Sequence, residues 1–262
     1  MQGCRRSGMT TPVAVCAKLP SQICASILCA LVSLSALGNG PRPLHPSATN
    51  SAVTSLQLTN APLQRVGPGV FALGKVRLDK PQRTVSFPAS INMAAGLLEY
   101  AVVAAQGKLH ESLLMTEADP VHIHLAMLLI GAKGETNTLP SDPPARTGIA
   151  GDNVTVWVNW KPDGTERRVR LEDLVFNLAT RSPASRGPWT YNGSRVVEGT
   201  YLAQRDGSIV ALITDPDALI NNPRPGADND QIWLVNTNAL PRADTPVQVE
   251  LELNPPLKPV TK

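Results

Sequence analysis

Apolar and polar residues alternate along many short stretches of the chain, and this pattern predicts β-strands. The stretches are residues 70–78, 84–91, 97–105, 108–115, 154–160, 166–171, 199–203, 208–214, 231–236 and 247–253. They do not alternate regularly with helical segments, as the strands of a doubly wound parallel sheet would. We therefore expect an α+β, mainly β fold with antiparallel sheets packed as a sandwich.

Turn residues indicate how some of these strands are joined. Gln106-Gly107 is expected to close residues 97–105 and 108–115 into a hairpin, and Pro162-Asp163-Gly164 to close a second hairpin. One main helix is expected near residues 120–130, because Asp119 can cap it, Pro120 suits its first position and Gly131 can end it. A shorter helix is expected within residues 171–178.

The N-terminus has the order of a secretory signal. Arg5, Arg6 and Lys18 precede an apolar run over residues 23–37, and small residues follow near Gly38. A membrane anchor is the alternative, but about 15 apolar residues fall short of the ~20 that span a bilayer. We expect a signal peptide over residues 1–38, export to the periplasm or the extracellular space, and no transmembrane segment in the mature chain.

Composition divides the rest into two parts. Residues 39–65 are rich in Pro, Ser, Thr and Asn and predict a flexible segment, whereas residues 66–258 are long enough for one globular domain. Residues 133–152 read as an exposed polar loop within that domain. Removing residues 1–38 would remove all 4 cysteines, so the mature domain must rely on its core rather than on disulfides.

Charge argues against a nucleic-acid partner. The net charge of +3 comes from 24 basic and 21 acidic residues, and residues 1–38 contain three of the basic residues and none of the acidic ones. The mature chain is therefore neutral, and it has no concentrated Lys/Arg patch for a phosphate backbone. An envelope protein or a small ligand is the expected partner.

Histidines supply the candidate chemistry. A divalent transition metal could be held by His110, Glu111 and His124 if the strand and the helix that carry them pack together, with Glu99, Ser112 and His122 as supporting residues. His122 and His124 cannot both reach one ion from a helix, because residues two apart lie ~200° apart around its axis. The alternative is that these histidines are exposed or make ordinary hydrogen bonds.

A catalytic motif is absent. His110 and Ser112 share one face of a predicted strand, but no nucleophile elbow of the Gly-x-Ser-x-Gly type occurs in the sequence. Glu99 and Glu111 could pair as carboxylates, or could lie on a wet face beside Lys108. No catalytic residue and no cofactor is therefore assigned.

Aromatic residues on an exposed strand could stack on a ligand. Trp157 and Trp160 have opposite parity, however, and point to opposite faces of their predicted strand. The tryptophans and tyrosines, which include Tyr191 and Tyr201, are more simply explained as core anchors.

Five parts of the sequence resemble a known family. Residues 98–100, the string Gly-Lys-Leu-His-Glu-Ser-Leu-Leu over 107–114 and residues 124–131 are similar to YdjY-domain proteins of bacteria such as planctomycetes. Residues 189–194 and 215–219 resemble later segments of that family. The resemblance implies an exported domain of uncharacterised role. An iron-sulfur role, which is associated with the enterobacterial namesake, is excluded because the mature chain would contain no cysteine.

Two hypotheses follow. The first is an exported, non-catalytic β-rich domain that binds a partner or ligand at the cell envelope. The second is a metal-binding, possibly hydrolytic protein with a site around His110, Glu111 and His124. They differ in whether these side chains converge on a concave pocket.

Overall fold

The computed structural model describes residues 61–135 and 149–255, and these residues are mainly β, as predicted. The predicted signal peptide, residues 39–60 of the predicted flexible segment, most of the predicted polar loop and the last residues of the chain lie outside the described residues. Among the described residues, no helix is long and apolar enough to cross a membrane.

The strands are β1 (Gln64–Gly67), β2 (Val70–Leu73), β3 (Val76–Asp79), β4 (Thr84–Ile91), β5 (Tyr100–Ala104), β6 (Ser112–Thr116), β7 (Asp152–Trp160), β8 (Arg167–Arg170), β9 (Val175–Asn177), β10 (Ser182–Pro183), β11 (Trp189–Tyr191), β12 (Val196–Val197), β13 (Thr200–Tyr201), β14 (Ser208–Ala211), β15 (Ile220–Asn221), β16 (Trp233–Val235) and β17 (Pro246–Leu253). The α-helices are α1 (Pro120–Leu129) and α2 (Leu202–Asp206), and the short 3-10 helices are η1 (Leu109–Glu111), η2 (Pro162–Gly164) and η3 (Leu171–Leu174). The short helix predicted within 171–178 is thus one 3-10 turn followed by β9.

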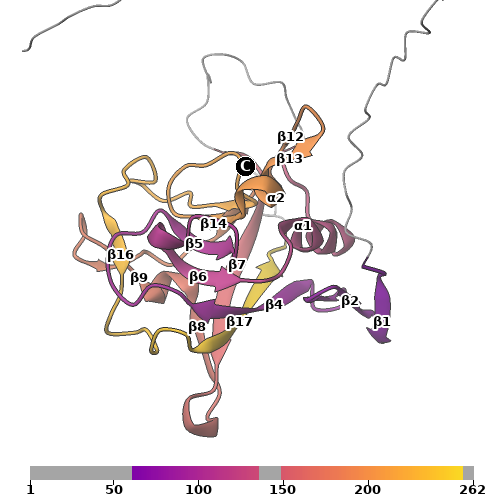
Figure 1. Ribbon diagram of the computed structural model, residues 1–262, viewed down its shortest axis with the longest axis horizontal. Coiled ribbons are helices and arrows are strands. Elements are labelled where there is room, and N and C mark those ends of the chain that lie inside the picture. The colour runs from indigo at the N-terminus through magenta and orange to yellow at the C-terminus, as the bar shows by residue number, and fades with distance from the viewer. Residues whose placement is uncertain (1–60, 136–148, 256–262) are drawn as a thin grey trace, which may run out of the picture. The chain divides into compact units, whose positions relative to one another are not determined.

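Eight strands close into a mixed barrel in the order β4-β17-β7-β11-β15-β14-β5-β6. Figure 1 labels these strands except β11 and β15. The ring closes because β6 pairs back onto β4, with Met115 opposite Ser90 and Leu114 opposite Ile91. The predicted sandwich is therefore wrong. Alternation in the sequence specifies which face of a strand is buried, but it does not specify whether the last strand of a sheet pairs with the first.

Two pairs in the barrel are parallel, whereas the other barrel pairs are antiparallel as predicted. β14 pairs parallel with β15, and β5 pairs parallel with β6. Residues 105–111 return along β5 instead of turning directly into a hairpin at Gln106-Gly107. Leu109 then packs against Tyr100 and Val103 on the outer side of β5, so this strand is buried on both faces. An unbroken apolar strand such as β5 is typical of such double burial.

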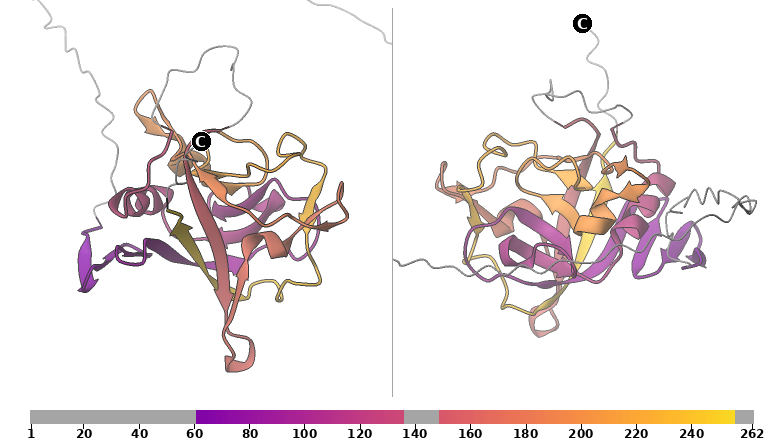
Figure 2. Two further views of the ribbon diagram at one scale, coloured as in Figure 1. Left: turned by 180° about the vertical axis from the view of Figure 1, so that it is seen from behind. Right: turned by 45° about the horizontal axis from the view of Figure 1, so that its top comes forward.

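The barrel interior is filled by every second residue of its long strands. The inward side chains of three neighbouring strands are Val85, Phe87 and Ile91 of β4, Val249 and Leu251 of β17, and Val154, Val156 and Val158 of β7, all at 0% exposure. The residues between them face outward. β7 and β8 continue beyond the barrel as the predicted long hairpin (Figure 2).

The predicted main helix is confirmed as α1. It lies near the point where one edge of β4 changes its pairing partner from β3 to β6. The first half of β4 pairs with β3, whereas its second half pairs with β6 on the same edge. At the change of partner, the hydroxyl of Thr116 donates to the carbonyl of Pro88 at 2.5 Å. Helix α1 follows β6 and packs on β3 and β4.

Candidate functional site

The two ends of β6 separate the predicted metal ligands. Glu111 and His110 lie in η1 before this strand, whereas His124 lies in α1 after it. A strand of 5 residues spans about 16 Å. Within the part of the chain that the structure describes, no three His, Cys, Asp or Glu side chains form a group that could hold a metal ion. The structure therefore does not bring His110, Glu111 and His124 together.

The η1 end of β6 carries a network of charged and polar side chains. The Lys108 ammonium donates to the Tyr100 hydroxyl at 3.0 Å, and this hydroxyl donates to Asp215 at 3.0 Å. Lys108 also lies 3.6 Å from the Glu111 carboxylate, and the His110 Nε2 lies 3.5 Å from that carboxylate. Burial raises the pKa of Tyr100 to about 12, so the phenol stays protonated. We call these residues, together with Glu99, the η1 network.

Glu99 and Glu111 form the carboxylate pair that the sequence left open, and Lys108 lies beside them. The pKa of Glu99 is raised, first by burial and then by the charge of Glu111, while Lys108 opposes the shift. His110 remains 81% exposed at its side chain, and the buried Ser112 hydroxyl donates to the backbone carbonyl of Lys108. The Ser112 hydroxyl therefore supports the backbone of η1.

His122 is buried between α1 and the turn that joins β2 to β3. Its side chain is 4% exposed, and its Nδ1 lies 3.3 Å from the Asp119 carboxylate. The tight turn between β2 and β3 packs against the ring, since a Cβ at Gly74 would lie 2.7 Å from Nδ1. Gly74 also has a φ of +57°, which favours glycine. His122 thus joins α1 to the β2–β3 turn.

His124 faces a different environment, a cavity of about 350 Å³ between α1 and the segment that includes β12 and β13. Figure 1 shows α1 beside α2, with β12 and β13 above them. The cavity is lined by Val121, His124, Leu125, Leu128, Gly134, Glu135, Asn192, Gly193, Ser194, Arg195, Val196 and Tyr201. Most of the lining surface is apolar. We call this the His124 cavity.

Two tyrosines hold the His124 ring. The Tyr191 hydroxyl hydrogen-bonds Nδ1 of His124 at 2.8 Å, and the Tyr201 ring packs 5.2 Å from the imidazole, centroid to centroid. Burial lowers the pKa of His124 to about 4, and it raises the pKa of both phenols. Near neutral pH the three groups are therefore uncharged. Nε2 is the ring nitrogen that has no hydrogen-bond partner among the described residues.

Hydrogen bonds fix the opposite wall of the cavity. Tyr201 donates to the carbonyl of Gly193 at 3.0 Å, and the buried Asn192 amide donates to the carbonyls of Pro216 and Ala218. Gly193 has a φ of +83°, and a Cβ there would lie 3.1 Å from Cε1 of His124. The backbone can approach the imidazole this closely because residue 193 is a glycine.

The cavity combines exposed aliphatic side chains with polar lining residues, among them His124, Asn192 and Ser194. Leu128 is 44% exposed and Val196 is 53% exposed, so both present aliphatic surface at the cavity. The Ser194 hydroxyl is already engaged, because it donates to the carbonyl of Asp217 and accepts from the Ala203 amide. The arrangement therefore suits binding of an apolar group better than nucleophilic catalysis by serine.

The sequence identified His124 but missed its partners. Tyr191 is 67 residues away in the chain, and only the barrel brings its strand β11 beside α1. The sequence contained only weak evidence that Tyr191 and Tyr201 belong to the site. Both tyrosines were among the aromatic residues assigned to the core, and Tyr191 lies in one of the segments that resemble the YdjY family. Burial of these tyrosines agrees with the core assignment, yet their hydroxyls and rings also form the site.

Comparison with known proteins agrees with the resemblance seen in the sequence. The model of the YdjY domain matches residues 76–252, which include the barrel strands except for the last residue of β17, as well as α1 and the His124 cavity. No curated protein and no solved structure matches the chain. The match covers well over half of the chain, and the protein therefore belongs to the YdjY-domain family.

Proposed function

We propose that this protein is an exported bacterial binding domain, without catalytic activity, whose ligand occupies the His124 cavity. The observation that carries the proposal is the neutral His124 imidazole, bonded through Nδ1 to Tyr191 in a cavity with apolar walls. Large apolar pockets with a few convergent polar groups and a shifted pKa are the usual form of a ligand site. Export is supported by the basic and apolar order of residues 1–38.

The volume and the lining of the His124 cavity limit the size and the chemistry of its ligand. A volume of about 350 Å³ lies at the small end of the range for ligand pockets, so we expect a small molecule or a single bulky side chain of a partner. Its apolar part would contact Leu125, Leu128 and Val196, and one hydrogen-bonding atom would meet Nε2 of His124. At the His124 end of the cavity a charged group would be disfavoured, because the phenols and the imidazole there are neutral, although Glu135 and Arg195 also line the cavity.

The metal-binding alternative has less support. A metal site requires three or more ligands around one point, and His124 lies at the opposite end of β6 from His110 and Glu111. His124 is also paired with a phenol rather than with a carboxylate that would orient a metal ligand.

NMR titration of the histidine ring protons tests the binding proposal. The probes are indole, phenol and benzamide, each an apolar ring with one hydrogen-bonding group. We expect at least one of them to shift the His124 Cε1 proton with saturation, and Leu128→Asp to abolish the shift. Leu178→Asp is the matched control, because Leu178 is equally exposed at 46% but lies outside the cavity lining. Shifts that persist in Leu128→Asp, or that spare His124 for every probe, would refute the site.

A further inference from the structure

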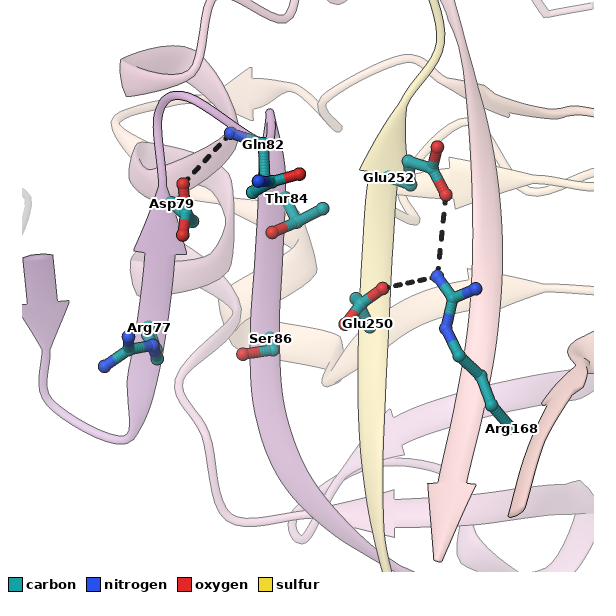
Figure 3. Close-up of a pocket in the computed structure, with 8 residues that line it drawn as sticks. All are labelled: Arg77, Asp79, Gln82, Thr84, Ser86, Arg168, Glu250 and Glu252. Carbon is teal, nitrogen blue, oxygen red and sulfur yellow. Dashed lines mark hydrogen bonds and ion pairs between the residues drawn. The ribbon is translucent and has the colours of Figure 1, made fainter. Parts of the chain in front are cut away.

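A second concave site lies on the outward side of the sheet (Figure 3). It shares no lining residue with the His124 cavity. It is a groove of about 470 Å³ over β3, β4 and β17, closed on one side by a residue of β8. The lining residues are all polar or charged: Arg77, Asp79, Gln82, Thr84, Ser86, Arg168, Glu250 and Glu252. We call it the outer groove.

Strand register places these side chains in two rows. Ser86 lies opposite Arg77 on one neighbouring strand and opposite Glu250 on the other. Thr84 in the same way lies between Asp79 and Glu252. Their neighbours along the strands fill the barrel interior, so these residues must face outward. Each row therefore presents a hydroxyl with a carboxylate of β17 on one side.

The two carboxylates on the β17 side of the groove, Glu250 and Glu252, contact Arg168 and Trp157. Arg168 lies 2.7 Å from the Glu250 carboxylate and 3.6 Å from the Glu252 carboxylate, as the dashed lines in Figure 3 mark. The indole N–H of Trp157 donates to Glu252 at 2.8 Å, and the Arg168 guanidinium stacks 3.7 Å from the centroid of the Trp157 ring. Stacking and hydrogen bonds together orient both carboxylates before any ligand arrives.

The β3 side of the groove carries the guanidinium group of Arg77. Arg77 is exposed, and it makes no hydrogen bond or ion pair with any residue that the structure describes. Asp79 beside it accepts a hydrogen bond from the backbone N–H of Gln82 at 3.0 Å. The Thr84 and Ser86 hydroxyls lie between the two walls (Figure 3) and likewise have no hydrogen-bond partner among the described residues. The groove thus has free donors on one side and fixed acceptors on the other.

We propose that the outer groove binds a short peptide with both termini free. Its ammonium group would approach the Glu250 and Glu252 carboxylates from the side of Thr84 and Ser86, opposite the side that Arg168 occupies. Its carboxylate would bind the Arg77 guanidinium, which suits bidentate recognition of carboxylates. The backbones of β3 and β17 are two strand spacings apart, about 10 Å. Two or three extended residues span such a gap between the charged side chains. A purely anionic ligand is disfavoured, since three carboxylates line the groove against two guanidinium groups.

Calorimetric titration of the purified protein with trialanine, N-acetyl-trialanine and trialanine amide tests this inference. Acetylation removes the ammonium charge, and amidation removes the carboxylate charge. We expect trialanine to bind at least tenfold more tightly than either derivative. Arg77→Gln should abolish the preference for trialanine over its amide, whereas Glu252→Gln should reduce the preference for trialanine over the acetylated peptide.

Controls separate binding from folding. Arg77 is exposed and unpaired among the described residues, so Arg77→Gln should keep the melting temperature of the parent protein. Arg65→Gln, which changes an exposed arginine of β1 outside the groove, should keep the binding preferences. Equal affinity for the three peptides, no measurable binding, or an unchanged acid-to-amide preference in Arg77→Gln would overturn the proposal. Because Leu128→Asp should leave trialanine binding intact, this test is independent of the His124 cavity.

Discussion

The two ends of β6 use similar residue types in opposite ways. At the η1 end, His110 is exposed among Lys108, Glu111 and other charged groups that satisfy one another. At the α1 end, His124 is enclosed by aliphatic side chains and two phenols, and burial has lowered its pKa. A histidine next to acids in the sequence is therefore a weaker indication of a binding site than a histidine whose surroundings deprive it of charge.

The difference lies in what remains available to a ligand. The members of the η1 network hydrogen-bond or pair with one another, so a ligand would have to compete with existing contacts. The His124 cavity instead keeps one ring nitrogen without a partner among the described residues, together with exposed apolar side chains at its rim. Four predictions sharpen this contrast, from the largest expected effect to the smallest.

Acid should destabilise the protein through His124. Above pH 6.5 the ring is neutral in both the folded and the unfolded state, but between pH 6.5 and about 4 the unfolded state binds the proton more readily. The free energy of unfolding should therefore fall with decreasing pH, by up to about 3 kcal/mol from this group. Urea unfolding at pH 7 and pH 4.5 measures the fall. His124→Gln should remove most of this component, and His110→Gln, which changes an exposed ring, should retain it.

Gly193→Ala should lower the free energy of unfolding by about 2 to 3 kcal/mol. The positive φ at residue 193 accounts for about 1 to 2 kcal/mol, and the close approach of a Cβ to His124 for the rest. Gly164→Ala is the matched control, because Gly164 has a φ of +81° but open space around its Cβ position. Equal losses in the two variants, measured by chemical denaturation, would mean that the His124 contact contributes nothing.

Tyr191→Phe should cost about 1 to 2 kcal/mol, since it removes the hydrogen bond to Nδ1 and leaves a buried ring nitrogen without a partner. The same variant should weaken fragment binding in the NMR titration, because the orientation of the imidazole is no longer fixed. Lys108→Met, which cuts the corresponding bond to Tyr100 in the η1 network, should leave fragment binding unchanged. Loss of fragment binding in Lys108→Met would contradict the separation of the two regions.

Glu99→Gln should have the smallest effect. It relieves the repulsion between Glu99 and Glu111, and because the raised pKa of Glu99 disfavours its ionised form in the folded state, the variant should be slightly more stable near neutral pH. The gain should stay within about 0.5 kcal/mol, because the side chain is partly solvated. A loss of more than about 1 kcal/mol in thermal denaturation would show that the Glu99 carboxylate makes a contact on which the fold depends.

Local sequence patterns were sufficient for the long elements of the fold. Thr84–Ile91 and β17 follow their alternating patterns, and α1 begins at Pro120 as its flanking residues predict. The predictions were less successful where strands are short or connections are unusual. The three-residue strand β11 is too short to give a clear period, and the return from β5 through η1 into a parallel partner carries no distinctive turn signal.

Candidate chemistry was predictable only in part. The sequence singled out His124, Glu99 and Glu111, and the carboxylate pair exists together with its Lys108 neighbour. It also grouped His110 with His124 on the hypothesis that a strand and a helix pack together there, whereas the two residues lie at opposite ends of β6. The outer groove had no signal of its own, since its residues come from β3, β4, β8 and β17 and become neighbours only through strand pairing.

The sequence by itself determined that this is a mainly β YdjY-domain protein, which residues alternate between core and surface, and where the principal helix begins. These properties depend on side-chain period and capping residues within a few positions of one another. Only the tertiary structure decided that the sheet closes into a barrel, that Tyr191 and Tyr201 enclose His124, and that Arg77 faces Glu250 across β4. Those contacts join residues far apart in the chain, and their register follows from packing of the whole core rather than from any local pattern.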